Sequence, residues 1–118
     1  MNAGNMEVLA KYGNAFQKEQ YLKPLMDGTI RSCFGMTEPA VASSDARNIS
    51  CSALKSADGK FYIVNGRKHW TSGAMDSRCT ICILMVKTDL QQTAYSQQSM
   101  LICPMNLRGV KIVRHLTV

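Results

Sequence analysis

The protein is a chain of 118 residues in which 14 Lys and Arg face 8 Asp and Glu, giving a formal net charge of +6. This length fits one compact domain. A hydrophobic content of 46% with 19% charged residues excludes a disordered or collagen-like chain. The longest apolar run, residues 81–86, is far shorter than the roughly 20 residues of a membrane-spanning helix. The opening residues 1–5 have neither the basic nor the apolar region of a secretory signal, so we expect an intracellular protein.

The five cysteines, at positions 33, 51, 79, 82 and 103, form an odd set without the spacing of a disulfide framework. Free thiols in a reducing compartment are therefore expected. Cys79 and Cys82 form a CxxC, but they lie in an apolar run that is typical of a buried strand. Residues i and i+3 of a strand point to opposite faces, so we expect no zinc or other metal site there.

The first quarter of the chain predicts two helices. Met6, Leu9 and Ala10 recur at the spacing of one helical face, and Gly13 stands where a helix would end. A second helix is expected to begin at Asn14, with Gln17 three residues later as the partner in a capping box.

That second helix carries an irregularity and a stop signal of its own. Pro24 falls inside its apolar stripe and predicts a kink or an irregular last turn, and Gly28 ends the helix. The stripe consists of Tyr21, Leu22, Leu25 and Met26.

After Thr29 the hydrophobic pattern changes to that of strands. Asp58-Gly59 predicts a turn, and Asn65-Gly66 predicts a hairpin between the strands on either side of it. Short strands with turn signals at this spacing indicate an antiparallel barrel or sandwich. The expected strands are residues 30–36, 49–54, 61–64, 67–71, 79–87, 99–104 and 110–116.

Two segments carry a resemblance to a known family. Residues 32–45 read SCFGMTEPAVASSD, and residues 62–74 read YIVNGRKHWTSGA. With Thr37 and Trp70 separated by 33 positions (70 − 37), they closely resemble the flavin-binding signature of the acyl-CoA dehydrogenases. The upstream helices resemble those that precede the barrel in this family. The branch containing family members 10 and 11 is the most similar, because it shares MTEP, ASSD and the later QSM and PMN.

The resemblance implies an α+β chain with short N-terminal helices followed by an antiparallel β-barrel. Residues 1–29 would be the end of the family's N-terminal helical domain, and residues 30–118 its middle, flavin-binding β-barrel domain, incomplete at the C-terminus. The activity implied is FAD-dependent α,β-dehydrogenation of fatty acyl-CoA thioesters. Implied partners are the acyl-CoA substrate, an electron acceptor such as an electron-transferring flavoprotein, and further copies of the enzyme. The compartment implied is the mitochondrion or the peroxisome.

The resemblance also assigns cofactor-binding residues. Thr37 would donate its hydroxyl to the polar edge of the flavin, Trp70 would lie against the ring, and Ser72 would reach N5. Small side chains after Pro39 would let backbone N–H groups approach a phosphate. Ser44 would touch both the flavin phosphate and the CoA part of the substrate. The complete cofactor set is Phe34, Met36, Thr37, Ala42, Ser43, Ser44, Trp70, Thr71 and Ser72.

The family's catalytic base is a glutamate of the C-terminal helical bundle. We therefore assign no catalytic residue to this chain, and Glu38 is interpreted as part of the TEP turn. His69 is expected to pack. Arg47 and Lys68 either assist an anionic cofactor or belong to a solvated surface. The isolated chain is expected to be inactive and to bind FAD weakly.

Other interpretations remain open at this point. A lone Trp in a strand is usually a core residue, and SSD is often a loop or a helix cap. The chain could be a truncated, non-enzymatic product that acts as a weak flavin binder or an interaction fragment. A remote alternative is a small basic β-barrel for single-stranded nucleic acid, although we expect no nucleic-acid partner. Its aromatic and basic candidates are Phe61, Tyr62 and Trp70 beside Lys60, Arg67 and Lys68.

Overall fold

The computed structural model describes residues 2–117, and its contacts divide the chain into two compact units. The first unit comprises Met1–Phe34, Ser72–Ile83 and Ile102–Val118, and the second comprises Gly35–Thr71 and Leu84–Leu101. This division by contacts does not follow the boundary at residues 29 and 30, which remains a prediction.

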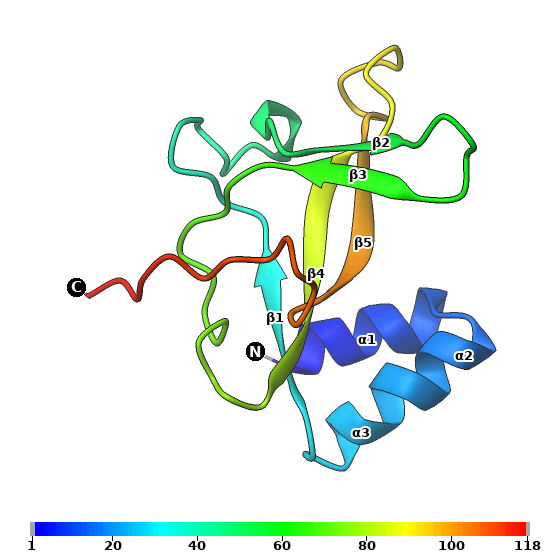
Figure 1. The fold of residues 1–118 in the computed structure, drawn as a ribbon, viewed down its shortest axis with the longest axis vertical. Coiled ribbons are helices and arrows are strands. Elements are labelled where there is room, and N and C mark those ends of the chain that lie inside the picture. The colour runs from blue at the N-terminus through cyan, green and yellow to red at the C-terminus, as the bar shows by residue number, and fades with distance from the viewer. Residues whose placement is uncertain (1, 118) are drawn as a thin grey trace. The chain divides into compact units, whose positions relative to one another are not determined.

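Helices form the start of the first unit, as expected from the sequence, and Figure 1 shows them packed together. The Asn14 capping box is confirmed. The Gln17 N–H donates to Asn14 Oδ1 at 2.8 Å, and the Asn14 N–H donates to Gln17 Oε1 at 3.0 Å. The elements are α1 (Asn2–Tyr12), α2 (Ala15–Gln17), a π-helical turn η1 (Lys18–Leu22) and α3 (Lys23–Met26).

The irregularity predicted around Pro24 is confirmed as the π-helical turn η1. Proline has no N–H to donate to the preceding turn. Immediately before it, the Lys23 N–H donates to the carbonyl of Lys18, five residues back. Gly28 then ends α3 with φ of 75°, in the left-handed region that glycine adopts without strain.

The core of the first unit is apolar. Leu9 of α1, Leu25 of α3, Ile81 and Ile83 are buried against one another. Partly buried apolar side chains pack around this cluster, namely Met6, Val8, Tyr21, Leu22, Ile30, Phe34 and Ile102.

One buried polar side chain also ties α1 to strand β1 (Arg31–Gly35) in the first unit. The amide of Asn5 donates to Ser32 Oγ and to the Cys33 carbonyl, each at 2.9 Å. Its burial is therefore compensated by hydrogen bonds.

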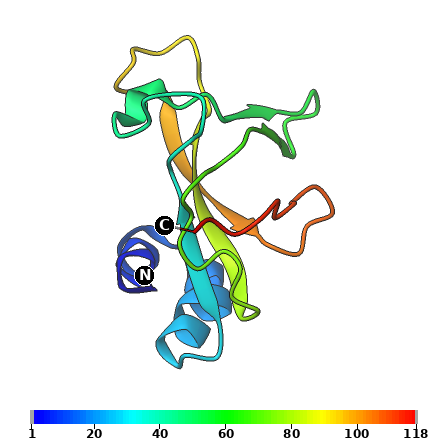
Figure 2. The ribbon, with the colours of Figure 1, turned by 90° about the vertical axis from the view of Figure 1, so that its left-hand side faces the viewer.

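The strands join in one sheet of order β1-β4-β2-β3, with β5 also paired to β4. The α+β class is confirmed. β2 and β3 form an antiparallel hairpin, with Ser52 opposite Asn65 (Figures 1 and 2). The single bridge between β2 and β4, Ser52 to Lys87, is parallel, which the sequence did not predict. The remaining bounds are β2 (Ser52–Lys55), β3 (Tyr62–Asn65), β4 (Cys79–Lys87) and β5 (Gln98–Pro104).

The hairpin predicted at Asn65-Gly66 is wrong. The turn between β2 and β3 contains Asp58-Gly59, and residues 67–71 form no strand. The physical role of Gly66 is a close approach. A Cβ there would lie 2.4 Å from Cys51 Sγ and 2.8 Å from Cys51 Cα, closer than any side chain permits. Glycine is therefore required because the chain passes over Cys51 at this point, and not because a hairpin turns there.

The strand predicted at residues 110–116 is also wrong. The segment is irregular, and within residues 2–117 no strand pairs with it. At its start the Val110 N–H donates to a nearby residue of the chain, the Leu107 carbonyl, at 2.9 Å. An alternating apolar pattern becomes a strand only where a neighbour accepts its backbone hydrogen bonds.

Candidate functional site

Most of the predicted site residues lie in the second unit. Phe34 and Ser72 belong to the first unit, where Phe34 packs against the apolar core and Ser72 is exposed. Within the second unit, backbone and side-chain hydrogen bonds bring residues 36–38 against residues 68–69. The predicted residues of the second unit are Met36, Thr37, Ala42, Ser43, Ser44, Trp70 and Thr71.

Thr37 and His69 form the centre of this contact. The His69 N–H donates to the Thr37 carbonyl at 2.9 Å, and the Thr37 hydroxyl donates to the His69 carbonyl. A hydroxyl has one proton to donate and two lone pairs to accept with. The proton of Thr37 is therefore used within the protein in this structure, and the hydroxyl has lone pairs left with which to accept. Donation from Thr37 to the flavin stays a prediction.

Trp70 follows directly after this contact and has an unusual backbone. Its φ is 55°, in the left-handed region that bulky residues rarely adopt. Its side chain is 53% exposed, and its ring lies 4.9 Å from the ring of His69 at an interplanar angle of 60°. Trp70 is therefore not a core residue. A strained residue with an exposed aromatic ring is a candidate for contact with a ligand.

A buried ion pair between Glu38 and Lys68 holds the same two segments together. The carboxylate, with its side chain 2% exposed, accepts from Lys68 Nζ at 2.8 Å. It also accepts from the backbone and hydroxyl of Ser50, each at 2.7 Å, and from the Cys51 N–H at 2.9 Å. Lys68 Nζ donates in addition to the Met36 carbonyl at 2.9 Å. We call these five residues the Glu38–Lys68 hub.

The hub keeps Glu38 ionised. Burial raises the pKa of this carboxyl, but hydrogen bonds from Lys68, Ser50 and Cys51 together outweigh burial and lower the pKa to about 2. A carboxylate that is ionised and fully bonded at neutral pH is a poor general base. This agrees with the interpretation of Glu38 as part of the TEP turn.

The hub is the part of the site that the sequence did not predict. Lys68 was interpreted as a surface or cofactor-contacting cation, yet its side chain is only 11% exposed. The signal was present in the sequence, since the acidic residue and the lysine occupy the two motifs that carry the family resemblance. Because Lys68 is sequestered, it is also removed from the basic surface that the nucleic-acid alternative needs.

The loop of small residues after Pro39 is built around Ser43. This buried hydroxyl accepts from the Glu38 N–H at 2.8 Å, so its bonding capacity serves the loop itself. Ala42 and Ser44 are exposed. The serine with a hydroxyl available at the surface is therefore Ser44.

Two further features border this loop. Asp45 caps the short helix η2 (Ala46–Asn48) and pairs with Arg47, whose guanidinium also donates to the Tyr95 hydroxyl at 2.8 Å. Arg47 is thus exposed but already paired. In contrast, the Thr71 hydroxyl oxygen is buried and has no hydrogen-bond partner within residues 2–117.

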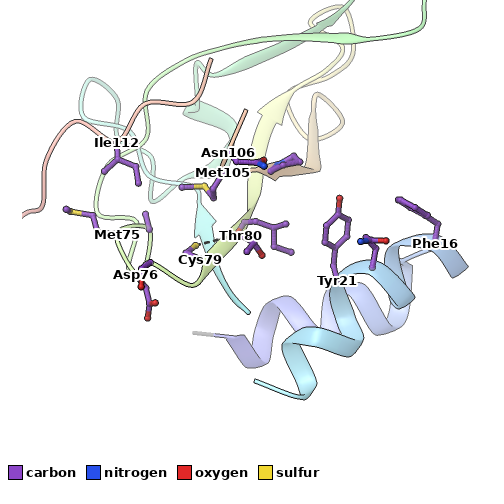
Figure 3. Close-up of a pocket in the computed structure, with 14 residues that line it drawn as sticks. Phe16, Tyr21, Met75, Asp76, Cys79, Thr80, Met105, Asn106 and Ile112 are labelled. Carbon is purple, nitrogen blue, oxygen red and sulfur yellow. Dashed lines mark hydrogen bonds between the residues drawn. The ribbon is translucent and has the colours of Figure 1, made fainter. Parts of the chain in front are cut away.

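A separate cavity of about 840 Å³ lies within the first unit (Figure 3). Phe16 and Tyr21 extend to it from the helices, while Met75, Met105 and Ile112 come from the irregular segments. The lining includes none of the residues that the family resemblance assigned to the cofactor.

The first unit also contains a group of interacting thiols. No disulfide joins the cysteines within the described residues. Cys79 and Cys82 both affect the pKa of the Cys33 thiol. A hydrogen bond with Cys82 and then burial raise the pKa of the Cys33 thiol, and burial, followed by Cys33, raises the pKa of Cys79 to about 12. No group of three His, Cys, Asp or Glu side chains within residues 2–117 is arranged to hold a metal ion.

Comparison with known proteins assigns the family. Residues 33–118 match the family model described as acyl-CoA dehydrogenase, middle domain. The chain is 53% identical over 117 residues to mouse acyl-CoA dehydrogenase family member 10, covering 99% of this chain and 11% of that protein. It is 50% identical over 118 residues to human family member 11, covering 99% of this chain and 15% of that protein.

A solved structure shares the fold. The structure of a putative acyl-CoA dehydrogenase from Mycobacterium abscessus has a TM-score of 0.93 and 44% identity, covering 98% of this chain and 28% of that one. The chain therefore spans between about one tenth and three tenths of the length of these relatives. Within residues 2–117, no helix is long and apolar enough to cross a membrane. On the family match and these identities, the chain belongs to the acyl-CoA dehydrogenase family.

Proposed function

We propose that this chain supplies part of the FAD site of an acyl-CoA dehydrogenase. The observation that carries the proposal is Trp70, which is half exposed and is held in a left-handed conformation next to the Thr37–His69 contact. An exposed aromatic ring with a fixed backbone offers a flat, preorganised surface at little cost in side-chain entropy.

The chemistry of the neighbouring residues fits FAD. The Thr37 hydroxyl retains lone pairs that can accept from an N–H of the flavin ring. Thr71 has a buried hydroxyl oxygen with no partner in the described residues, so hydrogen-bonding capacity remains beside Trp70. Ser44 and Ala42 are exposed and have small side chains, so a pyrophosphate can approach the backbone closely there. Bound FAD would supply the acceptor for the hydride that leaves an acyl-CoA thioester.

The remaining assignments rest on the family resemblance. In this proposal, Phe34, Met36, Ser43 and Ser72 complete the cofactor contacts, and Ser44 also contacts the CoA part of the substrate. The reaction is α,β-dehydrogenation of fatty acyl-CoA thioesters in a homo-oligomer of the mitochondrion or peroxisome, with an electron-transferring flavoprotein as acceptor. The chain contributes no catalytic base, so we expect it to bind FAD weakly and to dehydrogenate no acyl-CoA alone.

Equilibrium dialysis of FAD against the 118-residue protein tests this proposal. We expect saturable binding that Trp70→Ala weakens by about tenfold, because stacking on an aromatic ring contributes on the order of 1–3 kcal/mol. Phe61→Ala is the matched control, since Phe61 is another exposed aromatic of the same unit, 67% exposed, with no assigned role. Absence of saturable binding, or equal losses in the two variants, would contradict the proposal.

A further inference from the structure

We propose that Lys68 is a positioning residue, whose ammonium group bridges residues 36 and 38 and thereby fixes the orientation in which Trp70 presents its indole. The proposal rests on the proposed FAD site. Lys68 itself is buried and is not expected to touch the cofactor. It acts through the backbone of the segment that carries Trp70.

Consecutive hydrogen bonds join the two segments. Lys68 Nζ bonds to the Met36 carbonyl and to the Glu38 carboxylate, at 2.9 and 2.8 Å. The next residue, His69, bonds through its backbone to Thr37, which lies between those two acceptors. Trp70 is the residue that follows directly. Its position is therefore set by two consecutive residues that are both bonded to residues 36–38.

The backbone of Trp70 is strained. A left-handed backbone conformation is unfavourable for a residue with a Cβ, and it persists only where the surroundings over-determine it. The side chain is half exposed, so packing alone does not enforce this conformation. The bonds of Lys68 and His69 are the restraints present on the N-terminal side of Trp70.

The hub is anchored to the core of the second unit. Glu38 accepts from the Cys51 N–H, and Cys51 is buried in the apolar cluster of the second unit with Ala53 and Val86. Lys68 is therefore bonded to a carboxylate whose own position is fixed by the start of β2. Hydrogen bonds from a charged group are directional, so they restrict the position of the loop more than apolar contacts would.

The test uses the fact that the chain contains a single tryptophan. The longest-wavelength near-ultraviolet circular dichroism band, and fluorescence excited at wavelengths where the four tyrosines do not absorb, therefore report on Trp70. For Lys68→Met we expect the tryptophan band to collapse while the far-ultraviolet spectrum is retained, and FAD affinity to fall by about tenfold. Lys23→Met is the control, because it removes the lysine of an exposed Lys–Glu pair in the first unit and should leave both readouts unchanged.

A second variant, Lys68→Arg, tests the proposal if Lys68→Met does not fold. Arginine retains the charge, but its side chain is longer and its planar guanidinium holds the N–H donors in a fixed plane, unlike the compact ammonium of lysine. We expect a folded variant with an altered tryptophan band and an FAD affinity between those of wild type and Lys68→Met. A wild-type tryptophan band with wild-type FAD affinity in Lys68→Arg, or in folded Lys68→Met, would overturn the proposal. If the wild-type protein bound no FAD, the proposed function would fail, while the tryptophan spectra would still decide the positioning role.

Discussion

Different interactions stabilise the interior of each of the two units. The first unit has an apolar cluster built from Leu9, Leu25, Ile81 and Ile83, whereas the cluster around Cys51 in the second unit consists of Cys51, Ala53 and Val86 with Leu84 and Leu101 packed against it. The second unit adds the buried Glu38–Lys68 hub. Apolar packing is non-directional, while hydrogen bonds to a charge fix direction. The unit that carries most of the proposed cofactor contacts is therefore the one whose loops are held by directional bonds.

The largest predicted effect is at Lys68. Replacing it by Met leaves the Glu38 carboxylate buried without its cation, and breaking a buried pair in this way costs roughly 3–5 kcal/mol. We expect about 4 kcal/mol less free energy of unfolding in urea, followed by far-ultraviolet circular dichroism. A loss below about 1 kcal/mol would show that the pair behaves like a surface ion pair.

The corresponding substitution in the first unit is Leu25→Ala. It removes a buried side chain from the apolar cluster and should cost about 3 kcal/mol, within the range of 2–5 kcal/mol for such truncations. Unlike Lys68→Met, it should leave the tryptophan band of the folded protein unchanged. A collapse of that band in folded Leu25→Ala would remove the distinction between the two units.

Acid should weaken the hub specifically. The pKa of Glu38 is lowered to about 2 in the folded protein, against about 4.3 for a free glutamate, so its stabilisation is fully present above pH 5. This stabilisation, about 3 kcal/mol in total, is lost as the pH falls through 4 toward 2. Urea unfolding from pH 6 to pH 2 should show a shallower decline in Glu38→Gln than in Glu19→Gln, the matched control at an exposed ion pair. Parallel declines in the two variants would be inconsistent with the hub.

A smaller effect is expected at the start of α2. Asn14→Ala removes the side-chain cap and one half of the capping box and should cost about 1 kcal/mol, measured by urea unfolding. Gln17→Ala serves as comparison, because it removes only the reciprocal bond to the Asn14 N–H. Equal and negligible effects would mean that tertiary packing alone holds this turn.

The smallest effect is expected at the exposed ion pair of Lys23 and Glu19, whose side chains are 64% and 74% exposed. Lys23→Met should change the free energy of unfolding by less than about 0.5 kcal/mol, because water and salt screen the pair. The difference between the losses in free energy of unfolding in Lys68→Met and Lys23→Met measures how much burial adds to the stabilisation by a Lys–Glu ion pair. A large loss at Lys23 would mean that exposure does not separate the two pairs.

Local signals in the sequence predicted local structure well. The Asn14 capping box, the irregular turn before Pro24 and the strand at Cys79–Lys87 each follow from residues within a few positions of one another. The two failures, at Asn65-Gly66 and at residues 110–116, depend on distant partners. Gly66 serves a close approach to Cys51, fifteen positions away (66 − 51), and a strand needs a neighbour that the segment itself does not reveal.

The candidate site shows the same division. The family motifs pointed to Thr37 and Trp70 as candidates, but not to the bond between the Thr37 hydroxyl and the carbonyl of His69. Likewise, the basic character of Lys68 was visible, whereas its burial against Glu38 depends on how two segments thirty positions apart meet. Hydrogen-bond direction and burial are properties of tertiary contacts, so residue type and spacing could not supply them.

The most direct test of the central claim is a titration of the ¹⁵N-labelled protein with FAD, followed by two-dimensional NMR. The chain has one tryptophan, so a single indole N–H signal reports on Trp70. We expect this signal and the backbone signals of Thr37 and Ser44 to shift together and to saturate at the same FAD concentration. Saturable shifts elsewhere in the chain, with the Trp70 indole signal unmoved, would contradict this expectation.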